Sequence, residues 1–452
     1  MSVRFLTVHR LDGLKVLFQY FLMIKSRLVL LLAALVPGFV LTQPSSLLAG
    51  DWTQFRGPGG RATSDATTVP AEFTEEDYNW KIDLPGLGHG SPVVFGEKLF
   101  LTVVTADSER KVICYDTKDG EISWQWAQKF DKHGKHDFNE FASTTPCLDD
   151  KALYISWSSG TNFHAIALNH NGQLLWEREL GGFKGDHGSG TSPVLVGGNL
   201  FLFWDELGKQ RTSYAMIDAG SGETIWKHVR DWPSDRKELK TTYSTPTLFE
   251  NSKGETEILV SSMAFGIQSL DPQTGEENWR FDEQAGVRTV ASPVVEDGVI
   301  FATWGSGNGA KAHAAIIAGS ENEDGKPTIA WKWDSNKGLP YVPTPLAHNG
   351  LLYMWNDAGV LTCVRAKDGE VVFGPERVSG RYFSNPILIG DKIYCGSRED
   401  SEGGPAIVVV EASETFKILA RNPLEAGVNA TPAVADGKLF IRTDKHLISV
   451  GG

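Results

Sequence analysis

Short apolar runs alternate with polar turns along residues 78–452, in units that begin with Ser or Thr before Pro. An apolar run follows each Pro, then a short turn, then a second apolar run, as in Val93-Val94, Gly96-Glu97-Lys98 and Leu99-Phe100-Leu101. Two such runs split by a turn predict a β-hairpin, and Pro suits the first residue of a strand. The start signal occurs eight times: Ser91-Pro92, Thr145-Pro146, Ser192-Pro193, Thr245-Pro246, Ser292-Pro293, Thr344-Pro345, Ser384-Asn385-Pro386 and Thr431-Pro432.

A second signal runs in phase with the first and ends each unit. A polar turn closes with Gly, and Trp follows four residues later, at Gly120/Trp124, Gly172/Trp176, Gly222/Trp226 and Gly275/Trp279. Gly369/Phe373 is a degenerate copy. A period of roughly 50 residues is typical of solenoids, propellers and arrays, and strand-like units favour a propeller. The pattern therefore predicts an all-β protein, an eight-bladed β-propeller of four-stranded antiparallel blades.

The last unit lacks a fourth strand. His446–Val450 reads as its third strand, and the sequence after it supplies no Trp. We expect Tyr78–Ile82 to complete this blade, because a ring closed by an N-terminal strand joining the C-terminal blade leaves no exposed sheet edge to aggregate. The Trp residues in equivalent positions should then dock blade against blade: Trp80, Trp124, Trp176, Trp226, Trp279 and Trp331.

These residues resemble a known repeat. Leu270-Asp271, Thr274-Gly275 and Trp279 match the signature of the pyrroloquinoline-quinone (PQQ)-like β-propeller repeat family. The resemblance covers about residues 78–452 and implies the propeller fold. The superfamily includes quinoprotein dehydrogenases, BamB-like scaffold lipoproteins and secreted bacterial members without assigned activity, so the resemblance is specific for fold and weak for function.

The N-terminal region predicts export. Lys25 and Arg27 precede an apolar run over residues 28–41, and small residues up to Ala49 resemble a cleavage site. This order is typical of a secretory signal peptide, and the run is short for a membrane span; an uncleaved anchor is the alternative. We expect a signal peptide over residues 1–49, an irregular segment over 50–77, and a monomeric propeller, periplasmic or secreted, with no stable membrane insertion after cleavage.

Charge and candidate chemistry narrow the function. The formal net charge of −13 argues against nucleic acid, which is bound through basic contacts to phosphate. Quinoprotein dehydrogenases, which the chain resembles, hold PQQ with calcium under a disulfide between adjacent cysteines, whereas Cys114, Cys147, Cys363 and Cys395 are all separated. The cysteines are expected as buried thiols, with disulfides as the alternative. No calcium ligand set is matched, so we predict no cofactor, no metal and no catalytic residues, and keep a PQQ-dependent oxidoreductase as the alternative function.

Candidate binding residues lie just before the Ser/Thr-Pro signals. These segments feed the innermost strands and should line one mouth of the central channel, where a few convergent polar groups are the usual sign of a binding site. A network in which these groups satisfy one another is the alternative. We predict a non-catalytic binding or scaffolding module for a protein, peptide or glycan partner, with the site formed by His89, Asn139, His187, Tyr243, Arg288, Arg381, Tyr382 and Asn429.

Overall fold

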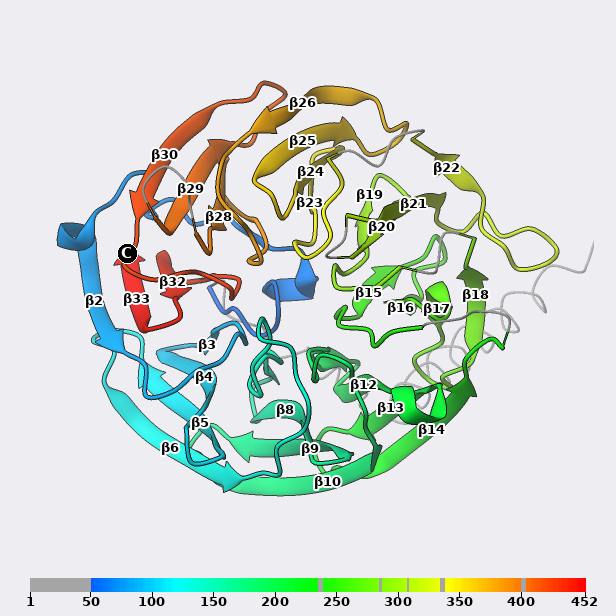
Figure 1. Ribbon diagram of the computed structural model, residues 1–452, viewed down its shortest axis with the longest axis horizontal. Helices are drawn as coiled ribbons and strands as arrows, with labels where there is room; N and C mark the ends of the chain where they lie inside the picture. The colour runs from blue at the N-terminus through cyan, green and yellow to red at the C-terminus, as the bar shows by residue number, and fades with distance from the viewer. Residues whose placement is uncertain (1–49, 235–238, 284–286, 307–308, 334–337, 400–403) are drawn as a thin grey trace, which may run out of the picture. The chain divides into compact units, whose positions relative to one another are not determined.

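The computed structural model describes residues 50–452 except 235–238, 284–286, 307–308, 334–337 and 400–403, so the predicted signal peptide lies outside the described residues. The described part is a ring of eight antiparallel blades around a central axis (Figure 1). The first blade contains β3 (Val93–Phe95), β4 (Lys98–Val104), β5 (Glu109–Asp116) and β6 (Ile122–Lys129), and the second contains β7 (Cys147–Leu148), β8 (Ala152–Ser159), β9 (Asn162–Asn169) and β10 (Leu174–Gly182). The third blade contains β11 (Val194–Val196), β12 (Asn199–Glu206), β13 (Arg211–Asp218) and β14 (Thr224–Asp231). The fourth contains β15 (Thr247–Glu250), β16 (Thr256–Ser262), β17 (Gly266–Leu270) and β18 (Glu277–Phe281).

The second half of the ring repeats this plan. The fifth blade contains β19 (Val294–Glu296), β20 (Val299–Gly305), β21 (Lys311–Ile317) and β22 (Ile329–Trp331), and the sixth contains β23 (Leu346–His348), β24 (Leu351–Trp355), β25 (Val360–Arg365) and β26 (Val371–Arg377). The seventh blade contains β27 (Ile387–Ile389), β28 (Lys392–Gly396), β29 (Ala406–Glu411) and β30 (Ile418–Pro423). The eighth contains β31 (Ala433–Ala435), β32 (Lys438–Arg442) and β33 (His446–Gly451), together with β2 (Tyr78–Asp83) from the N-terminal side. The predicted eight-bladed propeller is confirmed.

Burial follows the position of a strand within its blade. The second strands, such as β12 and β20, are buried along almost their whole length because blades cover both of their faces. The outermost strands β6 and β14 alternate between exposed and half-buried residues, since only one face meets a neighbouring blade. Continuous apolar runs therefore mark inner strands, and alternation marks the rim.

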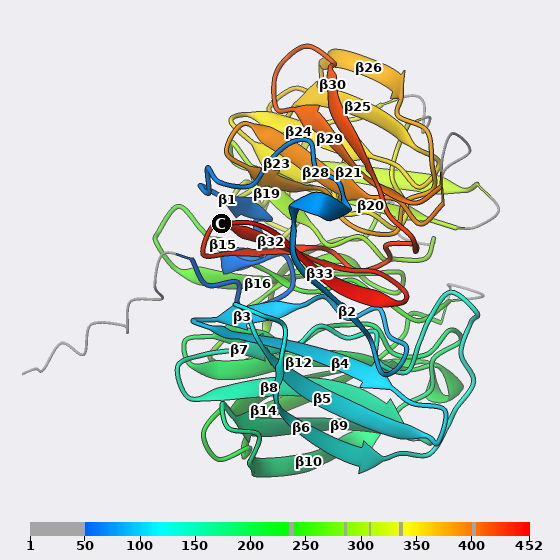
Figure 2. The same ribbon diagram turned by 90° about the vertical axis from the view of Figure 1, so that its left-hand side faces the viewer.

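The ring closes through the two ends of the chain. β2 pairs antiparallel with β33, with Lys81 opposite Ile448 and Ile82 opposite Leu447, and Figure 2 shows the two strands side by side. Residues more than 350 positions apart thus complete one blade, as the sequence predicts. The pairing removes the open edge that the eighth blade would otherwise present.

A closed ring of hydrogen bonds, here named the girdle, joins the residues that precede the eight prolines. In every blade the backbone N–H of this residue donates to the side-chain oxygen of its counterpart in the next blade, at distances from 2.5 to 3.4 Å. For example, Ser91 N donates to Thr145 Oγ1 (2.9 Å), and Thr431 N donates back to Ser91 Oγ (3.1 Å). The members are Ser91, Thr145, Ser192, Thr245, Ser292, Thr344, Asn385 and Thr431.

Trp residues of the outermost strands dock against glycines of the adjacent blade. A Cβ on Gly222 would meet the Trp176 ring at 2.6 Å, and the Trp176 indole N–H donates to Ala219 O (2.9 Å). The same Trp–Gly contact joins Trp80 to Gly120, Trp124 to Gly172, Trp226 to Gly275 and Trp331 to Gly369. Positive φ angles at these glycines, such as 72° at Gly222, further favour Gly.

Trp124 and Trp226 dock in this way but stay half-buried, because the outermost strand faces solvent on one side. Trp279 is the member of the predicted set that differs from the expectation. Trp279 bonds to Glu257 of its own blade (3.3 Å), because the corresponding loop of the next blade has no Gly placed against its ring.

The segment before β2 closes one end of the central channel. It contains the short helix η1 (Pro58–Gly60), the strand β1 (Thr63–Ser64) and the short helix η2 (Glu75–Asp77). Trp52 pairs with Val94 of the first blade, while β1 runs parallel to β27 of the seventh. Figure 1 shows η1 in blue at the centre of the ring. We call residues 51–62 the plug. No helix of the described chain is long and apolar enough to span a membrane.

The Trp–Gly contact makes a matched prediction. Gly222 and Gly298 have φ of 72° and 74°, but only Gly222 faces an indole ring; Gly298 has nothing within 4 Å of a built Cβ. Gly298→Ala should cost about 1–2 kcal/mol through the backbone alone, and Gly222→Ala about 1–3 kcal/mol more through overpacking. Urea unfolding measures both; equal losses would show that Trp176 does not require Gly222.

Candidate functional site

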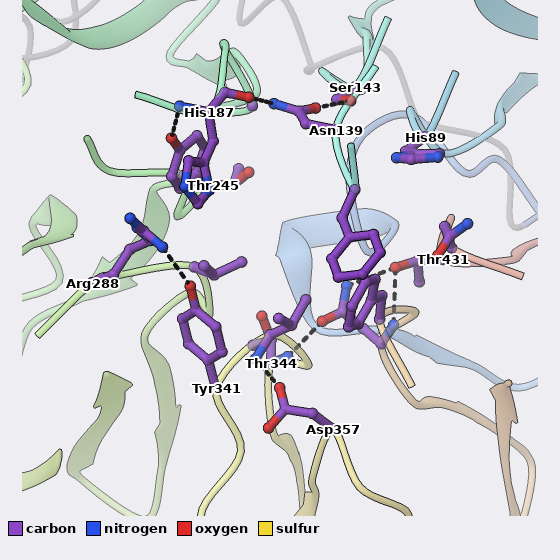
Figure 3. A pocket seen from close by; sticks show the side chains of 18 of the residues that line it. His89, Asn139, Ser143, His187, Thr245, Arg288, Tyr341, Thr344, Asp357 and Thr431 are labelled. Carbon is purple, nitrogen blue, oxygen red and sulfur yellow. Dashed lines mark hydrogen bonds between the residues drawn. The ribbon is translucent and has the colours of Figure 1, made fainter. Parts of the chain in front are cut away.

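A cavity of about 520 Å³ occupies the axis above the girdle (Figure 3). Of the eight sequence-predicted site residues, the structure brings seven together in its wall: His89, Asn139, His187, Tyr243, Arg288, Arg381 and Asn429. Phe55 of the plug also lines the cavity. So do seven residues of the girdle, namely Ser91, Thr145, Ser192, Thr245, Thr344, Asn385 and Thr431. The cavity is therefore formed by loops from around the ring.

The eighth residue, Tyr382, does not line the cavity. Its side chain is fully buried and lies against Trp355, with ring centroids 5.1 Å apart. Its neighbours Arg381 and Phe383 both line the cavity. In extended backbone, successive side chains point to opposite sides, so Tyr382 faces the core where its neighbours face the axis.

One wall is a chain of hydrogen bonds that crosses several blades. Tyr243 donates from its hydroxyl to Asp186 Oδ1 (2.9 Å), and Arg288 Nη2 donates to Asp186 Oδ2 (2.7 Å). Arg288 Nη1 also lies 3.4 Å from the Tyr341 hydroxyl. The His187 backbone N–H donates to Tyr243 (3.1 Å). This wall is held in one arrangement before any ligand arrives.

The charges of this wall are fixed by their partners. Burial raises the pKa of Asp186, but Arg288 and the Tyr243 hydroxyl outweigh it, so the pKa lies below its ordinary value. Burial, and then the Asp186 charge, holds the pKa of Tyr243 well above its ordinary value. Burial and Arg288 lower the pKa of His187. At neutral pH the wall therefore has an ionised Asp186, a cationic Arg288 and a neutral His187.

The opposite wall contains His89 and Asn429. Asn429 Nδ2 donates to Asp444 Oδ1 (2.7 Å), which orients the amide and leaves Asn429 Oδ1 buried with no partner among the described residues. Burial, then Arg442, Arg398 and Lys135, lowers the pKa of His89 to about 3, so His89 is neutral. This wall offers an amide oxygen and an uncharged imidazole.

A loop over residues 131–143 reaches across the mouth. Its tip residue Phe138 is 43% exposed, and its ring lies 5.5 Å from the Phe383 ring, which follows the sixth blade. The Arg398 guanidinium lies 4.3 Å from the Phe138 ring centroid. Asn139 anchors the loop by donating to His187 O (2.7 Å). The mouth thus combines aromatic faces with a cation.

Some lining residues escaped the sequence reasoning. Asp357 and Lys311 form an ion pair in the wall, and both lie in or beside the turn between the second and third strands of their blades. Neither residue lies in a loop that precedes Ser/Thr-Pro, which is where the predicted site residues lie. The turns after the second strand open toward the same mouth, so Asn356-Asp357 after β24 was the available signal. Phe138 and Phe383 carried no repeat signal.

The comparison with known families gives a match over part of the chain. Residues 74–262 match the family model described as outer membrane protein assembly factor BamB. The chain carries a PQQ-like repeat β-propeller. No curated protein sequence matches it.

Solved structures share this fold at low identity. A europium-containing methanol dehydrogenase has a TM-score of 0.59 at 13% identity, covering 87% of this chain and 89% of that one. BamB from Moraxella catarrhalis has a TM-score of 0.53 at 17% identity, covering 82% and 95%. Quinohemoprotein alcohol dehydrogenase from Comamonas testosteroni has a TM-score of 0.57 at 14% identity, and the match covers 89% of this chain and 80% of that one. At such identities the likeness shows the fold alone.

The cavity does not fit a quinone held by calcium. A hard cation takes about six or more oxygen ligands. Asp186 is paired with Arg288 and Asp357 with Lys311, so each of these carboxylates already serves a cation. No group of three or more His, Cys, Asp or Glu side chains in the described residues is arranged to hold a metal. We derive no redox step at this site.

His89 gives the site a pH signature. Its pKa of about 3 in the folded protein lies below the ordinary value of 6.5. Between these two pH values, His89 is therefore protonated in the unfolded chain and neutral in the folded protein. His89 therefore contributes stability above pH 6.5 that is lost as the pH falls toward 3. At pH 5 the loss is about 2 kcal/mol.

Urea unfolding at pH 7.5 and pH 5.0 checks this contribution. The free energy of unfolding of the parent should fall by about 2 kcal/mol more than that of His89→Gln, which cannot titrate. An identical fall in both proteins would mean that His89 protonates in the native state.

Proposed function

We propose that the chain is an exported binding propeller that takes a small ligand, or the end of a larger one, in its axial cavity. The single observation that carries this proposal is the form of the cavity: it is open at the mouth, floored by the girdle and the plug, and lined by convergent polar groups. Its volume of about 520 Å³ falls within the range of roughly 300–1,000 Å³ that is usual for small-molecule sites.

Preorganisation supports a binding role. The Asp186, Tyr243 and Arg288 side chains are fixed by one another, so a ligand would meet side chains that lose little conformational freedom. Phe138 and Phe383 offer apolar surface at the mouth. A protein, peptide or glycan could present its end to this cavity, as the sequence suggested.

The matching family model and the similar dehydrogenase structures suggest different roles for the chain. The matching family model carries the name of an outer membrane assembly factor, which is compatible with scaffolding, whereas the dehydrogenases suggest oxidoreductase chemistry. The paired carboxylates favour binding over quinone chemistry, because Asp186 and Asp357 already neutralise Arg288 and Lys311. Adding PQQ and calcium, and assaying dye reduction with alcohols or sugars, separates the two; turnover would overturn the binding proposal.

Export remains part of the proposal. The segment over residues 1–49 predicts a secretory signal, and we infer a periplasmic or secreted monomer with a mature N-terminus near Gly50. N-terminal sequencing of the exported protein tests this, and an intact segment over residues 25–41 would contradict it.

A cavity-filling variant tests the binding site. Val290→Trp places an indole in the cavity wall, whereas Val371→Trp places the same side chain on the exposed rim of β26. Small molecules released from each purified exported protein by denaturation are measured by mass spectrometry. We expect a compound to accompany the parent and Val371→Trp and to fall at least about tenfold in Val290→Trp, since one lost side-chain pocket is worth about 1–3 kcal/mol. Equal amounts in all three would exclude the axial cavity.

A further inference from the structure

The girdle leaves a set of hydrogen-bond donors on the axis. Its seven hydroxyls each accept a backbone N–H, and none donates a hydrogen bond to another group in the described chain. A hydroxyl has one proton to donate besides its two acceptor lone pairs. Six of these seven hydroxyl residues line the cavity. The floor of the cavity is therefore rich in O–H donors.

Beneath the girdle lies a buried positive charge. Arg56 of the plug is 2% exposed and donates to two backbone carbonyls, Gly60 O (3.1 Å) and Pro345 O (2.9 Å). Its Nη1 is buried with no partner, and no carboxylate is paired with it within the described ranges. Burial lowers its pKa to about 9, so it stays charged at neutral pH. A buried, unpaired charge is costly and needs compensation.

The position of Arg56 is held against its backbone preference. Its φ is 64°, in the left-handed region that side chains other than Gly rarely adopt. A small space of about 10 Å³ separates the plug from the girdle and is lined by Arg56, Thr245 and Ser292. Thr245 and Phe55 line both this space and the main cavity. The guanidinium thus lies on the far side of the girdle from the cavity.

The cations that line the cavity are each paired with a carboxylate. The pairs are Arg288 with Asp186, Lys311 with Asp357, and Arg381 with Glu399. Asn429 Oδ1 is the buried side-chain acceptor without a hydrogen-bond partner among the described lining residues. Arg56 therefore contributes a buried positive charge that no carboxylate of the described chain neutralises, and the girdle hydroxyls above it can donate hydrogen bonds. Such a site complements a ligand that supplies acceptors and negative charge.

We propose that the cavity binds an oxyanion, a carboxylate, phosphate or sulfate group of a small ligand, which rests on the girdle hydroxyls above Arg56. This inference rests on the proposed binding function and adds the ligand's chemical class. Arg56 is a positioning charge that acts through the field across the girdle without touching the ligand. The girdle recognises the acid group of the ligand, and the rest of the ligand is not specified by this contact.

Charge variants of the plug test the proposal. Titration calorimetry at constant ionic strength uses inorganic phosphate, sulfate and succinate as probes, with glucose as the neutral probe. Arg56→Met should weaken oxyanion binding about tenfold, the effect expected for one charge at about 10 Å and an effective dielectric near 20. Arg56→Lys keeps the charge and should retain affinity. Arg61→Met removes an exposed charge from the same segment and is the matched control.

Folding and binding can be separated in these variants. Replacing a buried charge by an apolar side chain of similar volume is often neutral or stabilising, so Arg56→Met should unfold at or above the parental midpoint. A structural role alone would instead lower its midpoint and leave oxyanion affinity unchanged, which overturns the proposal. Glucose binding that Val290→Trp abolishes, with no oxyanion binding, overturns the anion class and preserves the proposed function. No binding by any probe, with no compound released from the parent, overturns both.

Discussion

The girdle is the interaction on which the rest of the structure depends. Each blade supplies one backbone N–H and one side-chain oxygen, and the eighth donor, Thr431, returns to Ser91 of the first blade. Because the groups are buried, a missing acceptor would leave an N–H unsatisfied, at a cost of about 1–3 kcal/mol. Asn385 shows what the position requires: its amide oxygen replaces a hydroxyl and still accepts from Thr344.

The cavity is a consequence of this ring. The girdle fixes where the inner strands begin, and hence where the loops before them enter the mouth. Tyr243 and Arg288 can therefore meet at Asp186 from different blades. The plug closes the other end with Arg56 beneath the hydroxyls. The repeated residues before the prolines thereby form the floor of the cavity. In the sequence, a Ser or Thr before Pro indicates only where a strand begins.

Sequence reasoning reached the blades and their closure because both depend on local, periodic signals. The Ser/Thr-Pro and Gly–Trp spacings gave the number of units, and the missing strand after Val450 pointed to Tyr78–Ile82. It could not find the girdle, because the repeat reveals that Ser91 and Thr145 are equivalent but not that one bonds the other. It misplaced Tyr382, whose orientation depends on one residue of register, and it missed Phe138, whose loop crosses the mouth through tertiary contacts.

The central claim is that the girdle closes as one unit. Amide hydrogen exchange resolved to single residues tests it at the backbone N–H groups of Ser91, Thr145, Ser192, Thr245, Ser292, Thr344, Asn385 and Thr431. If the ring is continuous, all eight should open with one free energy, equal to that of global unfolding. Exchange of some of these amides through local opening, at a lower free energy than the others, would contradict a closed girdle.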